Sequence, residues 1–189
     1  MVETEIKLPV DDVVHISAML SNAGFAEVVP RSFEVNCVYD RPSGEIRARG
    51  ELLRLRRVAG ETVLTFKGKA QITSHKTREE LEIRISDYET CKLIFERLGF
   101  VQIFRYEKYR TEFRRPGDLG VVMLDETPIG SFLELEGKAS WIDQVAETLG
   151  YPASQYITAS YGALYLEYCS TRAIVPDDMV FSRRAEDSY

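Results

Sequence analysis

Several segments of the chain place a charged residue at every second position and an apolar residue between them. The opening MVETEIKLPV alternates Glu3, Glu5 and Lys7 with Ile6 and Leu8, and the later segment FLELEGK repeats the pattern. Successive side chains of a β-strand point to opposite faces. The alternation therefore predicts strands that have one charged face and one apolar face.

The same reasoning predicts eight strands. They are the opening segment and residues 32–40, 52–58, 62–69, 78–85, 104–114, 120–128 and 131–138. Most of the connections between them are short and resemble hairpins, which favours a largely antiparallel sheet. Residues 70–77, AQITSHKT, are expected to form a polar loop.

Helices are predicted in four further segments, residues 11–23, 87–98, 141–149 and 158–169. The first three follow an alternating strand and a capping residue, which we expect to be Asp11 or Asp12, then Ser86, then Ser140. Each of these three ends at a glycine followed by an aromatic residue, namely Gly24-Phe25, Gly99-Phe100 and Gly150-Tyr151. A glycine in the left-handed conformation commonly ends a helix, which explains the glycine. The repeated unit of strand, cap, helix and stop indicates a pseudo-symmetric α+β body.

Strand by strand, the charged side chains fall on one face of the predicted sheet. They are Glu3, Glu5, Lys7, Arg54, Arg56, Lys67, Lys69, Arg78, Glu80, Glu82, Arg84, Lys108, Arg110, Asp125, Glu134 and Glu136. The opposite face carries Leu53, Leu55, Leu64, Phe66, Leu81, Ile83, Ile85, Leu124, Leu133 and Leu135, which helices are expected to cover. An open antiparallel sheet would leave the charged face in water. A sheet of eight strands also tends to curl and close, and the charges would then line an enclosed space.

Charges of both signs in one cavity suit a particular ligand chemistry. Arginine and lysine recognise phosphate groups. Carboxylates without histidine or cysteine suit hard cations such as Mg²⁺ or Mn²⁺. A polyphosphate bridged to such a cation needs both sets of residues at once, so the mixed charge predicts a metal–polyphosphate site.

Composition excludes some other classes. The 189 residues are 44% hydrophobic, enough for one globular core, and carry a net charge of −6, which disfavours generic nucleic-acid binding. We expect no membrane span, because no apolar run approaches the required length. Three cysteines without CxxC spacing and an early polar segment without a secretory signal predict a reducing, cytoplasmic location.

The motifs as a set resemble the CYTH superfamily, also called the triphosphate tunnel metalloenzymes. The opening Glu3-x-Glu5-x-Lys7 matches its ExExK signature, and further motifs follow in family order. They are NCVYD, LRLR with Arg54 and Arg56, LTFKGK with Lys67, REELE with Arg78, Glu80 and Glu82, KYR with Lys108 and Arg110, LDETPIGSFLELE with Asp125, Glu134 and Glu136, and SYGALY. The resemblance covers a domain of residues 1–170 and leaves 171–189 as a loosely held tail.

The resemblance implies a closed eight-stranded antiparallel β-barrel, a triphosphate tunnel with helices packed outside. It assigns phosphate binding to Lys7, Arg54, Arg56, Lys67, Arg78, Lys108 and Arg110. It assigns the metal, Mg²⁺ or Mn²⁺, to Glu3, Glu5, Glu134 and Glu136, with Asp125, Glu80 and Glu82 as helpers. Many relatives are homodimers, so a dimer is an expectation of the same kind.

Three functions remain open at this level. The overall spacing looks most like the class IV adenylate cyclase branch, which converts ATP to cyclic AMP and pyrophosphate. A close alternative is hydrolysis of inorganic, nucleoside or thiamine triphosphate. A third is a non-catalytic module that binds polyphosphate or a nucleotide, although such a module would not need the full set of carboxylates.

Overall fold

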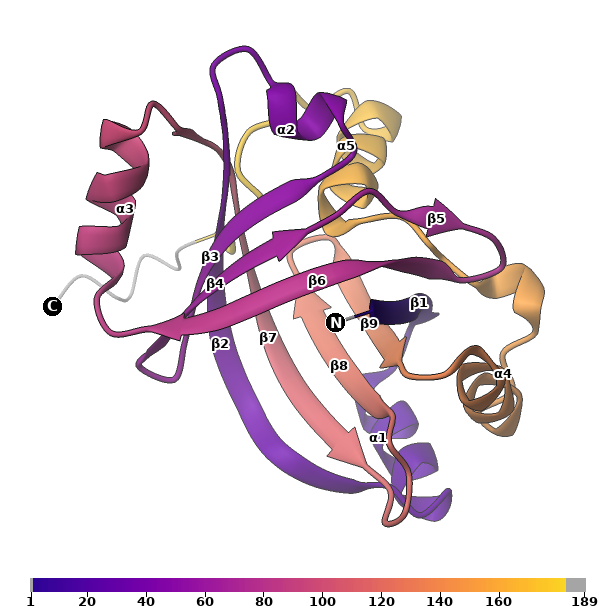
Figure 1. Cartoon of the computed structure of the whole chain (residues 1–189). Helices are drawn as coiled ribbons and strands as arrows, with labels where there is room; N and C mark the ends of the chain where they lie inside the picture. The colour runs from indigo at the N-terminus through magenta and orange to yellow at the C-terminus, as the bar shows by residue number, and fades with distance from the viewer. Residues whose placement is uncertain (1, 183–189) are drawn as a thin grey trace, which may run out of the picture.

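The strands close into a barrel in the computed structural model, which describes residues 2–182 (Figure 1). The strand order is β1-β9-β8-β7-β2-β3-β4-β6-β5, and an additional pairing of β1 with β6 closes the ring. Every pairing is antiparallel. The strands are β1 (Val2–Val10), β2 (Ala26–Asp40), β3 (Leu52–Val58), β4 (Glu61–Lys67), β5 (Gln71–Ile72), β6 (Lys76–Ile85), β7 (Val101–Arg114), β8 (Val121–Thr127) and β9 (Gly130–Glu136). The predicted eight-stranded antiparallel barrel in an α+β fold is confirmed, with β5 as a short extra strand.

The predicted polar loop at 70–77 is wrong at both ends. β5 pairs with the start of β6, which already begins at Lys76. The loop between them contains only three residues, and the backbone of Thr73 donates to the carbonyl of His75. Lys76 is polar although it lies in a strand, because its side chain lines the barrel interior, where polar side chains are the rule.

Within the described residues, five α-helices and one 3₁₀ turn surround the barrel. They are α1 (Val13–Asn22), α2 (Glu45–Ala48), α3 (Tyr88–Arg97), α4 (Ala139–Thr148), the 3₁₀ turn at Ala153–Gln155 and α5 (Tyr161–Thr171). Asp12 caps α1, as predicted, and Ser160 caps α5. The predicted caps Ser86 and Ser140 are wrong. Asp87 caps α3, and α4 begins earlier, after Lys138, without a side-chain cap.

The repeated glycine stop is confirmed at α1, α3 and α4. Gly24, Gly99 and Gly150 all have positive φ, between 80° and 85°. In each case the aromatic residue that follows donates its backbone N–H to a carbonyl of the last helical turn, as Phe25 does to Leu20 at 3.0 Å. Only glycine adopts this left-handed backbone without strain, so the chain turns at once from each helix into the next strand or segment.

Helices cover part of the outer face of the barrel. Ile16 and Leu20 of α1 and Ile142 and Val145 of α4 pack against the apolar residues of β1, β8 and β9. On the other side, Phe95 of α3 packs with a smaller cluster that includes Cys37, Tyr39 and Leu55. The expectation that helices cover the whole apolar face is wrong for β6, where Leu81 and Ile83 are 52% and 60% exposed.

The segment after α5 is tied to the barrel. Met179 exchanges backbone hydrogen bonds with Arg105 and Glu107 of β7, each 2.9 Å long, and is 1% exposed. The Asp178 carboxylate accepts from the backbone N–H of Arg105 at 2.7 Å. The expected loosely held tail is therefore wrong for residues 177–181, while 183–189 lie outside the described residues. Within residues 2–182, no helix combines the length and the hydropathy that a membrane crossing requires.

Candidate triphosphate and metal site

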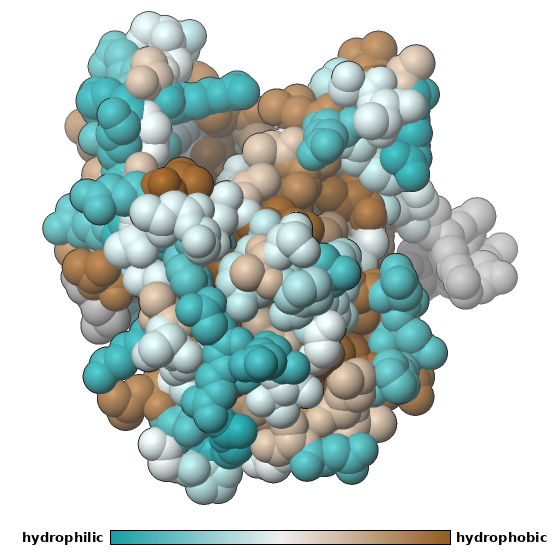
Figure 2. All heavy atoms as spheres, turned by 90° about the vertical axis from the view of Figure 1, so that its right-hand side faces the viewer, coloured by the Kyte–Doolittle hydropathy of each residue, from teal (hydrophilic) through white to brown (hydrophobic). Residues whose placement is uncertain are grey.

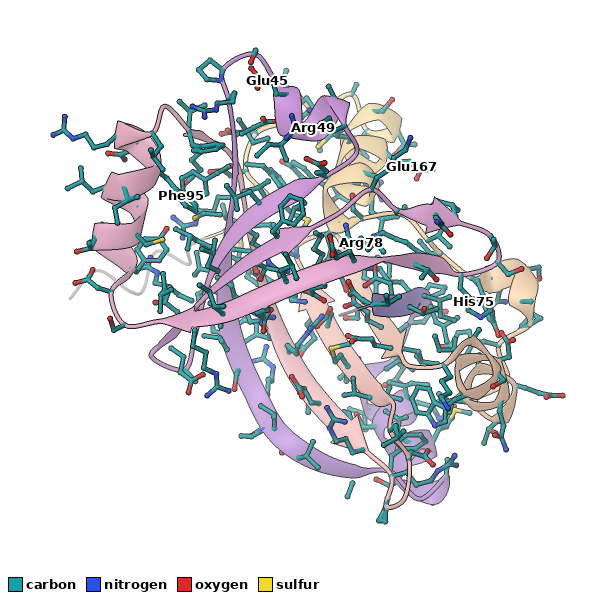
Figure 3. All side chains as sticks on the ribbon, viewed as in Figure 1. Glu45, Arg49, His75, Arg78, Phe95 and Glu167 are labelled. Atoms are coloured by element: carbon teal, nitrogen blue, oxygen red, sulfur yellow. The ribbon has the colours of Figure 1, made fainter. Side chains whose placement is uncertain are left out.

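A cavity of about 1210 Å³ runs through the interior of the barrel. Its wall comes from strands on every side of the ring and, at one end, from α2, α5 and residues 176–178. That end corresponds to the hollow at the top of Figure 2, on the side where Figure 1 places α2 and α5. In Figure 3, Arg78 lies among the strands that enclose the cavity, whereas Glu45, Arg49 and Glu167 lie around its upper rim.

The structure brings nearly all of the predicted site residues together. The cavity wall contains Glu3, Glu5, Lys7, Arg54, Arg56, Lys67, Arg78, Glu80, Glu82, Lys108, Arg110, Glu134 and Glu136. Asp125 is 0% exposed and lies behind the wall. Two residues of the same parity stay outside: Lys69 is exposed, and Arg84, 78% exposed, pairs with Glu61. The alternation of the strands predicted the interior correctly except near strand ends.

The charges divide between two halves of the ring. Strands β8, β7, β2 and β3 form what we call the basic wall, whose cavity-facing bases are Arg54, Arg56, Lys108, Arg110 and Arg114. Strands β4, β6, β1 and β9 form the acidic wall, whose carboxylates are Glu3, Glu5, Glu80, Glu82, Glu134 and Glu136. The acidic wall also carries Lys7, Lys67, Lys76 and Arg78, but its acids outnumber these bases.

Asp125 holds two bases of the basic wall in place. The Arg110 guanidinium donates to both carboxylate oxygens, through Nε and Nη2, at 2.7 Å each, and Lys108 Nζ donates to Oδ2 at 2.9 Å. The Tyr161 hydroxyl of α5 donates to the same oxygen at 2.5 Å. Asp125 was predicted to help bind metal, but these contacts occupy both of its oxygens, so the arrangement suits the positioning of phosphate-binding bases better.

Arg54 and Glu34 complete the basic wall. Arg54 donates to the Tyr106 hydroxyl and to Thr65 Oγ1, each at 3.2 Å. The Glu34 carboxylate lies 3.6 Å from Lys108 Nζ and 3.7 Å from Arg56. Burial opposes ionisation of Glu34, but Lys108 and Arg110, followed by the other bases, lower its pKa to about 2. This wall therefore keeps fixed positive charge that its own buried acids only partly neutralise.

The acidic wall contains carboxylates that repel one another. Lys67 Nζ donates to both oxygens of Glu3 at 2.7 and 2.8 Å, and lies 3.2 Å from Glu80. Burial and then repulsion from Glu5 nevertheless raise the pKa of Glu3 to about 8. Burial opposes ionisation of Glu5 as well, but Lys7 and Lys76, whose Nζ lies 2.7 Å away, hold its pKa well below the usual value.

Glu136 is the clearest sign of excess negative charge on this wall. It has no ion pair within 4 Å among the described residues, whereas its neighbour Glu134 pairs with Lys7 and Arg110 at 3.2 Å each. Burial, followed by repulsion from Glu134, raises the pKa of Glu136 to about 7. A partly buried carboxylate with like charges around it would be stabilised by a bound cation.

The donor set fits a hard divalent cation. The acidic wall offers carboxylate oxygens only, which suits Mg²⁺ or Mn²⁺ rather than a soft metal. Among the described residues, no three such side chains already converge on one point, because lysines and arginines stand between them. Glu3, Glu5, Glu134 and Glu136 are the residues that would hold the cation, together with oxygens of a bound phosphate.

Several residues of the site, including Arg114 of the basic wall, were missed by the sequence analysis. Glu34 shares the parity of Asn36 within a strand that was predicted, so sorting that strand by parity would have found it. Lys76 lies in residues 70–77, which the sequence predicts as a loop. Tyr106 and Tyr161 read as ordinary core residues in the sequence, and only the fold shows that one meets Arg54 and the other Asp125.

Known proteins share this fold. The family model described as "CYTH domain" matches residues 1–161. A protein of Methanocaldococcus jannaschii named "Putative adenylate cyclase" is 32% identical over 149 residues, which is 79% of this chain and 84% of that protein. A solved structure from Pyrococcus horikoshii has a TM-score of 0.75 at 25% identity, covering 88% of this chain and 99% of that one. A protein of Hippeastrum, described as a "putative adenylyl cyclase" with "a dominant" triphosphatase activity, has a TM-score of 0.63 at 17% identity and covers 88% and 95%.

Proposed function

Because this chain belongs to the CYTH domain family, we propose that it is a divalent-metal-dependent enzyme that acts on a triphosphate substrate. The leading reaction is the conversion of ATP to cyclic AMP and pyrophosphate. The observation that carries the proposal is the division of one enclosed cavity into a basic wall and an acidic wall. Neither half alone would explain why the barrel buries so many ionisable side chains, since burial of charge is costly without a matching ligand.

The two walls suit the two components of a metal–triphosphate complex. Arg54, Lys108 and Arg110 bind phosphate oxygens, and the hydrogen bonds to Tyr106 and Asp125 fix the directions of these bases before the substrate arrives. The carboxylates of the acidic wall hold the divalent cation. When bound, that cation neutralises charge on the phosphates and polarises the reacting phosphorus centre.

In the cyclase reaction the ribose 3′-oxygen forms a bond to the α-phosphorus, and the bond from that phosphorus to the α–β bridging oxygen breaks. Pyrophosphate leaves with the bonding electron pair, and the hydroxyl proton passes to a carboxylate of the acidic wall or to water. The chain supplies positioning and charge stabilisation, and no covalent nucleophile is required. Bases that face one side of the triphosphate stabilise the charge that develops on the leaving pyrophosphate.

Hydrolysis is the second candidate, and a structural neighbour favours it. The Hippeastrum protein shares the fold and is described by a dominant triphosphatase activity. The same walls serve a water molecule that attacks the terminal phosphorus, because only the nucleophile differs. A non-catalytic module is the third candidate, and the complete set of carboxylates on the acidic wall argues against it.

Product analysis distinguishes these functions. The protein is incubated separately with ATP, inorganic triphosphate and thiamine triphosphate, with Mg²⁺ or Mn²⁺, and the products are separated by anion-exchange chromatography. Cyclic AMP with an equal amount of pyrophosphate identifies a cyclase, and orthophosphate release identifies a triphosphatase. If no product forms from any of the three substrates with either metal, the proposal is wrong.

A matched pair of variants connects turnover to the site. Glu134→Gln removes one carboxylate of the acidic wall and is expected to abolish turnover while the protein stays folded. Glu126→Gln is the control, because Glu126 lies outside the cavity wall and pairs with Arg31. Equal activity of the Glu134 variant and wild type would remove that residue from the metal site.

A further inference from the structure

One buried base of the cavity has no role in the proposed reaction. Lys76, the first residue of β6, lines the cavity and is 5% exposed. Its Nζ donates to Glu5 Oε1 at 2.7 Å, whereas Lys7 and Arg78 lie 3.6 and 3.8 Å from the same oxygen. Lys76 is paired directly with Glu5 in the register of β1 with β6, so the two side chains meet across neighbouring strands. The fold therefore places a fixed ammonium group on a carboxylate that is a candidate metal ligand.

Lys76 differs from its neighbours on the acidic wall in the number of acids that it contacts. Lys67, for comparison, lies 2.7 Å from Glu3 and 3.2 Å from Glu80. In the part of the chain that the structure describes, Glu5 is the one carboxylate within 4 Å of Lys76 Nζ. The charge of Lys76 is therefore directed at a single candidate metal ligand, and removing that charge would affect Glu5 before any other acid.

The backbone that carries Lys76 is fastened on the outside of the barrel. The preceding residue, His75, contacts α4 through Nε2, which lies 2.9 Å from Asp143 Oδ1, and the Tyr156 hydroxyl donates to the same oxygen at 3.1 Å. His75 is 8% exposed, and Figure 3 shows it on the side of the barrel near α4. Lys76 thus extends from a fixed backbone, and its flexible four-carbon side chain is the part that can carry the ammonium group to another acceptor.

Lys76 and a divalent cation compete for the same carboxylate. Hard divalent cations bind carboxylate oxygens, and two positive charges repel each other strongly at contact distances. A cation that binds Glu5 must therefore displace Lys76 Nζ or remain beside its charge. A triphosphate changes this competition, because its oxygens offer the ammonium group another acceptor and lysine binds phosphate as a mobile point charge.

We propose that Lys76 is an internal counter-ion of Glu5, which keeps free divalent cations away from the acidic wall until a triphosphate draws the ammonium group off the carboxylate. The protein then takes up its metal together with the triphosphate and binds free metal only weakly. The inference rests on the proposed function, since it concerns the same cavity. It goes further, because it names the residue that couples the binding of the metal to the binding of the triphosphate.

Titration with free Mn²⁺ in the absence of any triphosphate tests the competition, with electron paramagnetic resonance as the measure of bound metal. Lys76→Met removes the charge but keeps most of the side-chain volume, and it should bind Mn²⁺ at least about 10-fold more tightly than wild type. Lys76→Arg keeps the charge and should stay within about 3-fold of wild type. Lys92→Met is the control, because Lys92 pairs with Glu96 on the exposed side of α3, and it should stay within about 2-fold.

A second measurement uses wild type and does not depend on how the variants fold. The ¹⁵Nζ resonance of Lys76 is assigned through its side-chain carbons and followed by nuclear magnetic resonance. It should shift when inorganic triphosphate is added in EDTA, because the ammonium group changes its acceptor. It should keep its position when Mg²⁺ is added alone, because Lys76 then stays on Glu5.

The outcomes separate this inference from the proposed function. If wild type binds free Mn²⁺ as tightly as Lys76→Met does, or if Mg²⁺ alone shifts the Lys76 resonance as triphosphate does, the counter-ion role is wrong while the proposed function stands. An equal gain in affinity in Lys92→Met would reveal a general effect of net charge and would overturn the inference as well. If calorimetry detects no binding of inorganic triphosphate to wild type, with or without Mg²⁺, the proposed function itself fails.

Discussion

The basic wall and the acidic wall are both built from alternating strands, yet the charged side chains of the two walls differ in how fully they are paired. On the basic wall, Asp125 holds Lys108 and Arg110 through hydrogen bonds of 2.7–2.9 Å, and Glu34 lies 3.6 Å from Lys108 Nζ. On the acidic wall, Glu136 has no ion pair within 4 Å in the part of the chain that the structure describes, and its pKa is raised to about 7. The bases of the basic wall thus have buried acids as partners, whereas Glu136 on the acidic wall has a negative charge that a bound cation would offset.

This difference makes opposite predictions for the two walls. Removal of a carboxylate from the basic wall leaves buried cations without partners and should destabilise the protein. Removal of the unpaired carboxylate of Glu136 from the acidic wall relieves repulsion and should stabilise the metal-free protein.

The largest effect is expected at Asp125. Asp125→Ala leaves Lys108 and Arg110 buried without their shared partner, and should lower the free energy of unfolding by about 3–5 kcal/mol. Chemical denaturation followed by circular dichroism measures it. Glu126→Ala, one residue along, removes a partly exposed pair with Arg31 and should cost no more than about 1 kcal/mol. Equal losses in the two variants would show that the contacts of Asp125 contribute no more to the free energy of unfolding than an exposed ion pair does.

Arg54 should matter more to binding than to stability. Arg54→Ala removes a buried guanidinium from the basic wall, and should raise the Kd for inorganic triphosphate about 10- to 100-fold, the range that loss of charged hydrogen bonds implies. Arg57→Ala serves as the control, because Arg57 lies on the exposed outer side of the same strand over the ring of Tyr88. An unchanged Kd for the Arg54 variant would remove this residue from the phosphate set.

The Tyr161 hydroxyl is expected to contribute a smaller share to the network. Tyr161→Phe keeps the ring near Lys7 and Lys108, whose Nζ atoms lie 5.0 and 5.1 Å from its centroid, but removes the donor to Asp125. The free energy of unfolding should fall by about 1–2 kcal/mol. Tyr151→Phe removes an exposed hydroxyl that donates to the carbonyl of Pro9, and should have less effect in the same assay.

The smallest effect has the opposite sign. Glu136→Gln removes a carboxylate that Glu134 and Glu80 repel, and should raise the free energy of unfolding by about 1 kcal/mol in EDTA at pH 8. In excess Mg²⁺ the gain should shrink or reverse, because the variant also loses a candidate metal ligand. A clear loss of stability in EDTA would contradict the claim that the other carboxylates of the acidic wall repel Glu136.

The alternation of charged and apolar residues predicted the barrel and most of the charged wall. A strand that lines a closed ring keeps the same face inward along its length, so parity alone placed Glu3, Glu134 and Arg54 correctly. The prediction from parity was wrong at a strand end, because Arg84 lies beyond the enclosed part of the ring. It also missed Lys76, because polar residues that face the interior resemble those of a loop.

Tertiary packing decided the features that the sequence could not show. Ile103 reaches the cavity because of a register shift in the pairing of β2 and β7, which the local sequence pattern does not indicate. Tyr161 reads as an ordinary helical core residue until α5 is seen against Asp125. Residues 177–181 show no clear alternation of polar and apolar residues, and the backbone hydrogen bonds to β7 that order them depend on an open strand edge in the assembled fold.

The central claim is that the two walls together bind a triphosphate with a divalent cation. Its most direct test is a calorimetric titration of wild type with inorganic triphosphate, once in EDTA and once in Mg²⁺, over a time too short for turnover. The account predicts binding in both conditions and at least about tenfold tighter binding with Mg²⁺, since the cation joins the phosphates to the acidic wall. The same affinity with and without metal, or no binding in either, would contradict it.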